Sequence, residues 1–167
     1  MISVRQIISG GQTGVDRAAF DAAIKMGLEI GGFVPKNRLA EDARVPKKYK
    51  NLIETETPEY KERTRLNVVN SDATLILSNG ELAGGSKLTE ELAKRAQKPV
   101  LHLDFQRLSS EELMASARRW LDAINPKILN IAGPRASSDV GIYKTAFEFL
   151  SELLKRDEVE PHPRISL

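Results

Sequence analysis

Glycine-rich turns follow three short apolar runs in this chain, and each turn leads into a stretch with helical spacing. Glycine lets the backbone take positive φ and lets a ligand approach main-chain N–H groups closely. A helix that begins just beyond such a turn adds unpaired amides and a partial positive charge. If the runs are parallel strands, the turns meet at one edge of a sheet, where they would hold an anionic, phosphorylated ligand. The turns are residues 9–14, 84–86 and 132–135.

The first turn, residues 9–14, has more glycine than a simple strand-to-helix connection needs. Gly10 and Gly11 permit a tight exit from the strand, and Gly14 lets the helix begin close to it. A tight turn with an acidic residue at the helix start is the plainer interpretation, and it stays open. If the turn binds a ligand, Asp16 complements the helix end and Arg17 reaches a phosphate. The ligand-binding residues predicted here are Gly10, Gly11, Gln12, Thr13, Gly14, Asp16 and Arg17.

The spacing of this turn is G-G-x-x-G, which differs from the G-x-G-x-x-G pattern of dinucleotide-binding proteins. The second predicted strand is followed by Pro35, Lys36, Asn37 and Arg38. An NAD enzyme places a carboxylate there for the ribose hydroxyls. The sequence therefore disfavours a nicotinamide-dependent dehydrogenase.

The second turn imitates a P-loop without meeting its requirements. Gly80 and Gly85 stand at P-loop spacing, but the serine and lysine that follow are in reversed order, which disfavours an NTPase. We expect instead that Gly84, Gly85 and Ser86 donate main-chain amides to the ligand, with the hydroxyl of Ser86 or Thr89 assisting. A helix cap at Thr89 without any ligand is the alternative.

The third turn offers one clamp for an anion. Gly133 and Pro134 interrupt the chain after an apolar run, and Arg135 follows at the predicted carboxyl end of the strand. The planar guanidinium of arginine suits a phosphate. Gly133 and Arg135 are therefore predicted ligand residues, although a loop with a helix cap at Ser138 or Asp139 explains the segment equally well.

Between the first two turns lies a basic segment, residues 36–50, without a clear secondary-structure period. A solvated charged face is one interpretation, and a lid that attracts acidic ligands is the other. Tyr49 is the only aromatic residue in the segment, and nucleic-acid binding needs stacking aromatics among the charges. The basic residues are Lys36, Arg38, Arg44, Lys47, Lys48 and Lys50.

The composition restricts the function further. The 25 basic and 23 acidic residues leave a net charge of +2, too small for a general nucleic-acid binder. There is no cysteine, which excludes disulfides and thiolate catalysis, and the two histidines are far apart, so we expect no protein-ligated metal. No apolar run approaches the ~20 residues of a membrane-spanning helix, and no basic-then-apolar leader is present. We therefore expect a cytoplasmic protein with no membrane partner.

The turns require strands and helices that alternate along the chain. Apolar runs predict strands near residues 4–9, 30–34, 72–78, 100–103 and 128–132. Helical spacing predicts helices near 15–27, 58–70, 88–97 and 140–155, with another after the capping sequence at 109–112. This alternation predicts an α/β fold, a three-layer αβα sandwich around a mostly parallel sheet of about five strands. We expect a single domain over residues 1–156 and a polar C-terminal tail over 157–167.

Three motifs of the chain resemble those of a known family. The segments SGGQTGVDRAA (9–19), GGSKLT (84–89) and IAGPR (131–135) are similar to the molybdenum-cofactor carrier family, the circularly permuted branch of the SLOG superfamily. This superfamily of Rossmann-like proteins includes the Lonely Guy phosphoribohydrolases. The resemblance implies a Rossmann-like fold, a homo-oligomer, and a nucleotide-like or pterin-phosphate ligand along the glycine turns. The implied ligand is molybdenum cofactor or a nucleotide.

The hydrolases of the superfamily carry the motif P-G-G-x-G-T-x-x-E, in which the glutamate is catalytic. In this chain Ala83 replaces the proline, and Leu92 stands where that glutamate would be, which leaves Glu90 or Glu91 as substitutes. The sequence thus predicts a binding or carrier protein for a phosphorylated nucleotide-like or pterin ligand. The alternatives are an N-glycosidase acting on a nucleoside monophosphate and a partner-binding module without a ligand.

Overall fold

The computed structural model describes residues 2–156, so the predicted tail at 157–167 lies outside the described residues. The helices are α1 (Val15–Lys25), α2 (Tyr60–Val69), α3 (Gly84–Arg95), α4 (Ser110–Ile124) and α5 (Ile142–Leu153), with a 3₁₀ segment η1 (Lys36–Arg38). The strands are β1 (Gln6–Ile8), β2 (Glu29–Val34), β3 (Leu39–Ala40), β4 (Ala43–Arg44), β5 (Leu52–Glu54), β6 (Ala73–Ser78), β7 (Val100–Asp104) and β8 (Ile128–Ala132).

Six strands form one sheet in the order β5–β2–β1–β8–β6–β7, and every neighbouring pair is parallel. This confirms the predicted α/β class and parallel sheet, with one strand more than predicted. The additional strand is β5, which lies between the strand predicted near 30–34 and the helix predicted near 58–70, where no element was predicted. Its three residues are too few to show an apolar pattern, and Ile53 at this sheet edge is largely exposed. Strands β3 and β4 form a separate antiparallel pair.

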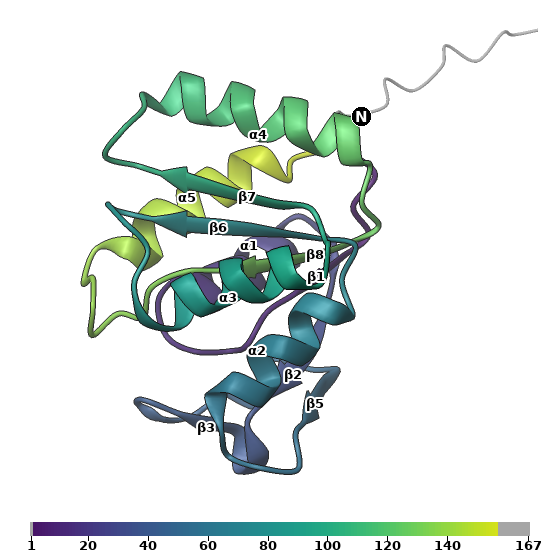
Figure 1. Cartoon of the computed structure of the whole chain (residues 1–167), viewed down its shortest axis with the longest axis vertical. Coiled ribbons are helices and arrows are strands. Elements are labelled where there is room, and N and C mark those ends of the chain that lie inside the picture. The colour runs from purple at the N-terminus through teal and green to yellow at the C-terminus, as the bar shows by residue number, and fades with distance from the viewer. Residues whose placement is uncertain (1, 157–167) are drawn as a thin grey trace, which may run out of the picture.

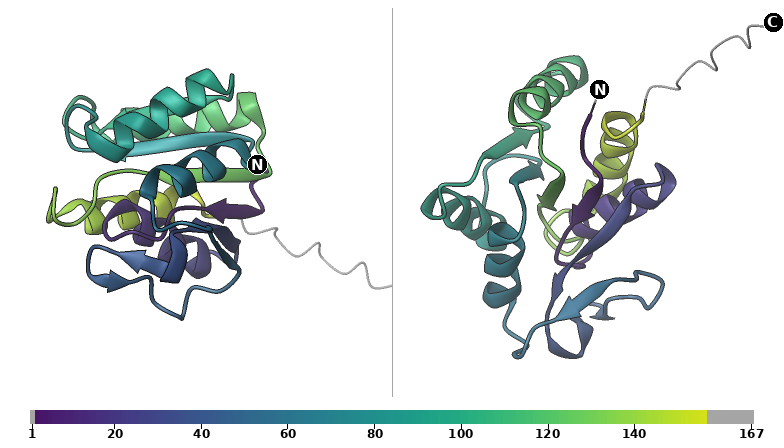
Figure 2. Two further views of the ribbon diagram at one scale, coloured as in Figure 1. Left: turned by 60° about the horizontal axis from the view of Figure 1, so that its bottom comes forward. Right: turned by 90° about the vertical axis from the view of Figure 1, so that its right-hand side faces the viewer.

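Helices cover both faces of the sheet and make three layers (Figure 1). Helix α1 packs against α5 on one face, with α4 beside α5, and α2 packs against α3 on the other face. The side views in Figure 2 show the sheet between the two helical layers. Because both faces are covered, a central strand such as β6 is buried along its whole length. The apolar residues of β1, β6 and β8 form one core with those of α1 and α5.

Three neighbouring strands at the centre of the sheet carry the three glycine turns. Strands β1, β8 and β6 lie side by side, so the segments that follow them leave the same edge of the sheet. From β1 the chain moves to β2 on one side, and from β6 it moves to β7 on the other. Connections that run in opposite directions leave a crevice at the carboxyl ends of the strands, where open α/β sheets bind ligands.

Helix α3 begins earlier than the sequence predicts. The prediction placed its start at Leu88 and assigned the preceding glycines to the turn. Gly84 and Gly85 instead form the first turn of the helix, with Ala83 as the N-cap residue and no capping side chain. Glycine is a poor helix former, so local propensity does not explain these two residues.

The basic segment at 36–50 is docked onto α1. Tyr49 is buried and packs against Phe20 of α1, with the ring centres 5.1 Å apart and the planes tilted by 45°. Its hydroxyl donates a hydrogen bond to Asp21 at 2.9 Å. Within the segment, Arg38 donates to the backbone carbonyls of Val45, Pro46 and Tyr49. These contacts favour a fixed loop over a mobile lid.

Candidate functional site

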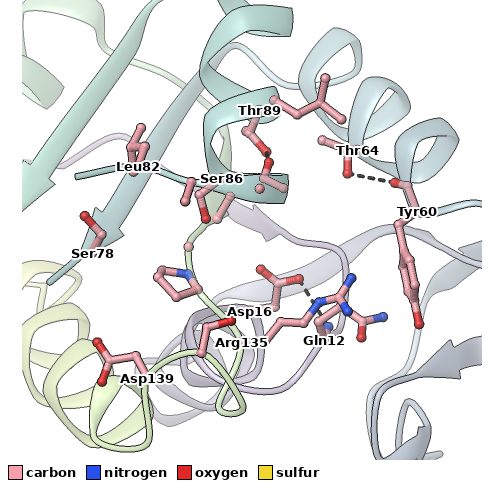
Figure 3. A pocket seen from close by; sticks show the side chains of 18 of the residues that line it. Gln12, Asp16, Tyr60, Thr64, Ser78, Leu82, Ser86, Thr89, Arg135 and Asp139 are labelled. Atoms are coloured by element: carbon pink, nitrogen blue, oxygen red, sulfur yellow. Dashed lines mark hydrogen bonds between the residues drawn. The ribbon is translucent and has the colours of Figure 1, made fainter. Parts of the chain in front are cut away.

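A cavity of about 430 Å³ lies at the carboxyl ends of β1, β6 and β8, a size that suits a small ligand. All three glycine turns contribute to its walls. Figure 3 shows Ser86 across the cavity from Asp16, with Tyr60 at one end and Asp139 at the other. The predicted site residues that line it are Gln12, Asp16, Gly84, Gly85, Ser86, Thr89, Gly133 and Arg135.

The first turn of α3 forms one wall of the cavity. The amides at a helix start have no partner within the helix, and no side chain caps them here. A Cβ atom built on Gly84 or Gly85 would meet no heavy atom within 4 Å. Gly84 has a φ of +50°, in the left-handed region that favours glycine, but Gly85 has no positive φ. Packing and backbone angle therefore leave glycine at Gly85 unexplained, and Gly85 is an exposed residue that lines the cavity.

Two hydroxyl groups of α3 face the same space. Ser86 and Thr89 are both buried and both line the cavity. Thr89 donates its hydroxyl proton to the carbonyl of Gly85 at 2.8 Å. The hydroxyl of Ser86 makes no hydrogen bond to another described residue.

A buried ion pair closes the opposite side. The Asp16 carboxylate lies 3.3 Å from the Arg63 guanidinium, and the two side chains are 5% and 12% exposed. The backbone N–H of Gln12 donates to the same carboxylate at 3.1 Å. Burial raises the pKa of Asp16 and lowers the pKa of Arg63, and the attraction between the two opposes both shifts. The Nε of Arg63 is buried without a hydrogen-bond partner among the described residues.

Arg135 supplies a second cation. Its guanidinium carbon lies 4.3 Å from the ring centre of Tyr60, and it forms no ion pair with any of residues 2–156. Arg135 is close enough to the buried pair for its charge to act on both pKa values. It opposes the rise that burial causes in the pKa of Asp16, and it adds to the fall that burial causes in the pKa of Arg63. Two guanidinium groups therefore lie near the one buried carboxylate of this wall, and the charge of Arg135 also acts on Glu41.

Asn79 and Asp139 form the far end of the cavity. The side-chain amide of Asn79 donates to the Asp139 carboxylate at 2.7 Å. This bond joins the segment after β6 to the segment before α5, so it fixes two cavity walls relative to each other.

The segment after β6 is held in place by the neighbouring strand β7. The carboxylate of Asp104 accepts a hydrogen bond from the N–H of Gly80 at 2.7 Å, and the Ser78 hydroxyl is bonded to His102 Nε2 at 2.6 Å. Burial raises the pKa of Asp104, but the N–H donors of Gln106 and Gly80 together keep it below its usual value. Asp104 and His102 thus shape the turn that carries the glycines.

The glycines of the first turn do not line the cavity. Gly10 lies under Arg63, where a Cβ atom would come within 1.5 Å of the guanidinium. Gly11 and Gly14 have φ values of +74° and +79°, and a Cβ on Gly14 would lie 2.3 Å from the carbonyl oxygen of Pro134. In the described geometry these glycines bring segments into close contact, because no other residue type leaves enough room.

Thr13 and Arg17 also lie outside the cavity, since the β3–β4 pair engages both. The Thr13 hydroxyl is bonded to the Glu41 carboxylate, which also binds the Ser137 hydroxyl. Arg17 pairs with Asp42 at 2.5 Å and donates to the carbonyl of Gly11 at 3.2 Å. The prediction that Arg17 reaches a phosphate does not fit this geometry, because Asp42 holds its guanidinium elsewhere.

The sequence prediction missed the contribution of α2. Tyr60, Arg63 and Thr64 all line the cavity, at the i, i+3, i+4 spacing of one helix face. Polar residues at this spacing resemble an ordinary solvated face, so the spacing alone did not predict a cavity wall. The one available signal was that Arg63 and Arg65 cannot lie on the same helix face, so at most one of them can point to the cavity. In the structure Arg63 points inward and Arg65 is exposed.

Neither Glu90 nor Glu91 is among the residues that line the cavity. Glu90 pairs with Lys94, one helical turn away, at 3.1 Å, and Glu91 is exposed. The carboxylates at the cavity belong instead to Asp16, Glu81 and Asp139. The hydrolase alternative therefore lacks, at this cavity, the carboxylate that the sequence offered for it.

Two further findings concern residues 2–156 only. No three side chains of His, Asp or Glu come together in a group that could hold a metal ion. No helix in this range is both long and apolar enough to cross a membrane.

The fold and the cavity define an α/β protein of the Rossmann-like class with a crevice where the strand order reverses. The chain belongs to the circularly permutated YpsA SLOG family, whose model matches residues 7–154. A crystal structure of a "Putative molybdenum carrier protein" from Syntrophus aciditrophicus SB is similar, with 49% sequence identity and a TM-score of 0.87. The match covers 91% of this chain and 95% of that chain. A search of the curated proteins found no match. These findings confirm the family predicted from the three motifs.

Proposed function

We propose that this protein binds and carries a phosphorylated small molecule, nucleotide-like or pterin-like, in the cavity at the carboxyl ends of β1, β6 and β8. The observation that carries the proposal is the first turn of α3, where two glycines leave open space beside uncapped amides. A phosphate placed there accepts hydrogen bonds from the amides and lies at the positive end of the helix. A ligand in this space would explain the glycine at Gly85, which packing and backbone angle leave unexplained.

The charge of the cavity supports the same ligand class. Arg63 and Arg135 face one buried carboxylate, that of Asp16, and Arg135 has no anionic partner among the described residues. A phosphate would give Arg135 an anionic partner through charge-assisted hydrogen bonds, which are stronger than neutral ones. The unbonded hydroxyl of Ser86 adds a donor on the other wall.

The similar protein from Syntrophus aciditrophicus SB is named as a molybdenum carrier, which makes molybdenum cofactor the first ligand to test. Ser86, Arg135 and the amides of α3 fit the phosphate of such a pterin. A nucleoside monophosphate offers the same phosphate, so the structure favours the shared chemistry. We further propose a cytoplasmic homo-oligomer, and the oligomeric state can be measured by light scattering on the purified chain.

Titration calorimetry with AMP and with phosphorylated pterin precursors tests the proposal. We expect binding that weakens about tenfold in Ser86→Ala, since one hydrogen bond to a charged group contributes about 1.5 kcal/mol. Ser151→Ala is the matched control, because Ser151 lies on α5, outside this cavity. If no phosphorylated ligand binds at millimolar concentration, the proposal is wrong.

A further inference from the structure

The contact between Tyr60 and Arg135 spans the cavity between two different elements. Tyr60 is the first residue of α2, and Arg135 belongs to the segment between β8 and α5. The guanidinium carbon lies 4.3 Å from the ring centre, and both residues line the cavity. Arg63 approaches the same ring at 5.9 Å. Tyr60 is thus the only aromatic residue among the described residues that line the cavity.

This contact has no evident structural duty. Tyr60 is half-buried and does not belong to the apolar core. Its hydroxyl makes no hydrogen bond to a described residue, and neither does the Arg135 guanidinium. An arginine without an ion-pair partner is held over the ring only by the stacking itself, an interaction that contributes little at partly exposed sites.

From this arrangement we infer that Tyr60 is a stacking platform for a heteroaromatic ring of the ligand, and that Arg135 covers the platform until the ring displaces it. The inference rests on the proposed function and names a second subsite for the same ligand. A flat guanidinium and a flat heterocycle use the same aromatic face, so the ring takes the place that Arg135 holds. Once displaced, Arg135 is free to pair with the phosphate bound at α3.

The arrangement has a consequence for selectivity. A ring-free phosphate engages the amides of α3 but leaves Arg135 on Tyr60. A phosphate that carries a ring gains both the stack and the released cation. Ring-bearing phosphates therefore bind more tightly than phosphates of the same charge without a ring.

Calorimetry on the full chain compares AMP and 6-hydroxymethylpterin phosphate with ribose 5-phosphate. We expect at least one of the two ring-bearing ligands to bind about tenfold more tightly than ribose 5-phosphate, since stacking on an aromatic side chain gives effects of this order. The better of the two identifies the ring as purine or pterin. Equal affinity of all three overturns the inference and leaves the phosphate proposal intact. Binding of none overturns both.

Variants at Tyr60 locate the effect. Tyr60→Phe keeps the aromatic ring, so we expect the affinity ratio between the ring-bearing ligand and ribose 5-phosphate to be retained. Tyr60→Leu removes the ring and should reduce this ratio to about 1. Ribose 5-phosphate affinity is expected to change less than threefold in both, which shows that the phosphate subsite is intact. A tenfold preference that persists in a folded Tyr60→Leu protein overturns the inference. Should Tyr60→Leu fail to fold, the ultraviolet absorbance of AMP bound to the wild-type protein decides, because stacking lowers it and an unstacked ring leaves it unchanged.

Discussion

Replacing Gly85 with alanine separates binding from stability in this protein. Gly85 lies in the first turn of α3 without positive φ, and its missing Cβ points into space with no heavy atom within 4 Å. Gly84 is less suitable because its φ of +50° would strain any other residue. Gly85→Ala therefore adds one methyl group at a residue that lines the cavity and causes no clash within the described protein.

The two effects of this substitution have opposite signs. Alanine is favoured over glycine in helices by up to ~1 kcal/mol, so we expect the free energy of unfolding to rise by about 0.5 kcal/mol in this first turn. The methyl group lies where a phosphate would approach the amides at about 2.9 Å. Losing one such charge-assisted hydrogen bond costs about 1.5–3 kcal/mol, which weakens ligand affinity roughly 10- to 150-fold.

Urea denaturation measures the first effect, and calorimetry with AMP or a pterin phosphate measures the second. Gly141→Ala is the control for the affinity measurement, because Gly141, the N-cap residue of α5, has a φ of −88° and has no heavy atom within 4 Å of its missing Cβ. It does not line the cavity, so its affinity should match that of the wild type. If Gly85→Ala binds the ligand as tightly as the wild type, the open space beside α3 is not where the phosphate lies, and the reasoning is refuted.

Three further predictions concern charged side chains, namely those of Arg63, Arg135, Glu41 and Asp42. Gly10→Ala places a Cβ atom 1.5 Å from the Arg63 guanidinium, and displacing that buried group should cost about 2 kcal/mol in the free energy of unfolding, measured in urea; an unchanged value would contradict the packing argument. Arg135→Gln should leave stability within about 0.5 kcal/mol, because no ion pair with a described residue is lost, but should weaken phosphate binding about tenfold in calorimetry. The pKa of Glu41 is lowered chiefly by the Ser137 hydroxyl and that of Asp42 chiefly by Arg17, so both carboxylates stabilise the fold above their unfolded pKa values. This contribution is lost as the pH falls below about 4, and the double variant Glu41→Gln, Asp42→Asn should show a flatter fall in stability over that range when unfolding is followed by circular dichroism.

Much of the fold followed from the sequence because strands at the centre of a covered parallel sheet are continuous apolar runs. The runs ahead of the three turns predicted β1, β6 and β8, and the family motifs implied a Rossmann-like fold, but the order of the strands was not predicted. Strand β5 escaped prediction because its three residues lie at the sheet edge, where Ile53 is exposed and no run develops.

The candidate site was predicted in part, and the division has a physical cause. Backbone features such as the glycines at the start of α3 show in the sequence, since glycine is chosen for its geometry. Side-chain contacts that depend on tertiary packing cannot be read from the local sequence. Nothing local to Arg17 indicates that Asp42 will hold it, and nothing local to Arg63 indicates that Gly10 makes room for it.

The glycines of the three turns are alike in sequence but divide into two kinds in space. At Gly14 and Gly133 a Cβ atom would lie 2.3 Å from a backbone carbonyl oxygen, so these positions are glycine because the protein's own chain fills the space. At Gly85 the corresponding space is empty and opens onto the cavity. Substitution at the first kind must lower stability and binding together, whereas substitution at Gly85 should lower binding alone. A ligand that enters beside α3 accounts for this difference. A purely structural turn does not, because alanine at Gly85 would increase helix stability and would disrupt no contact.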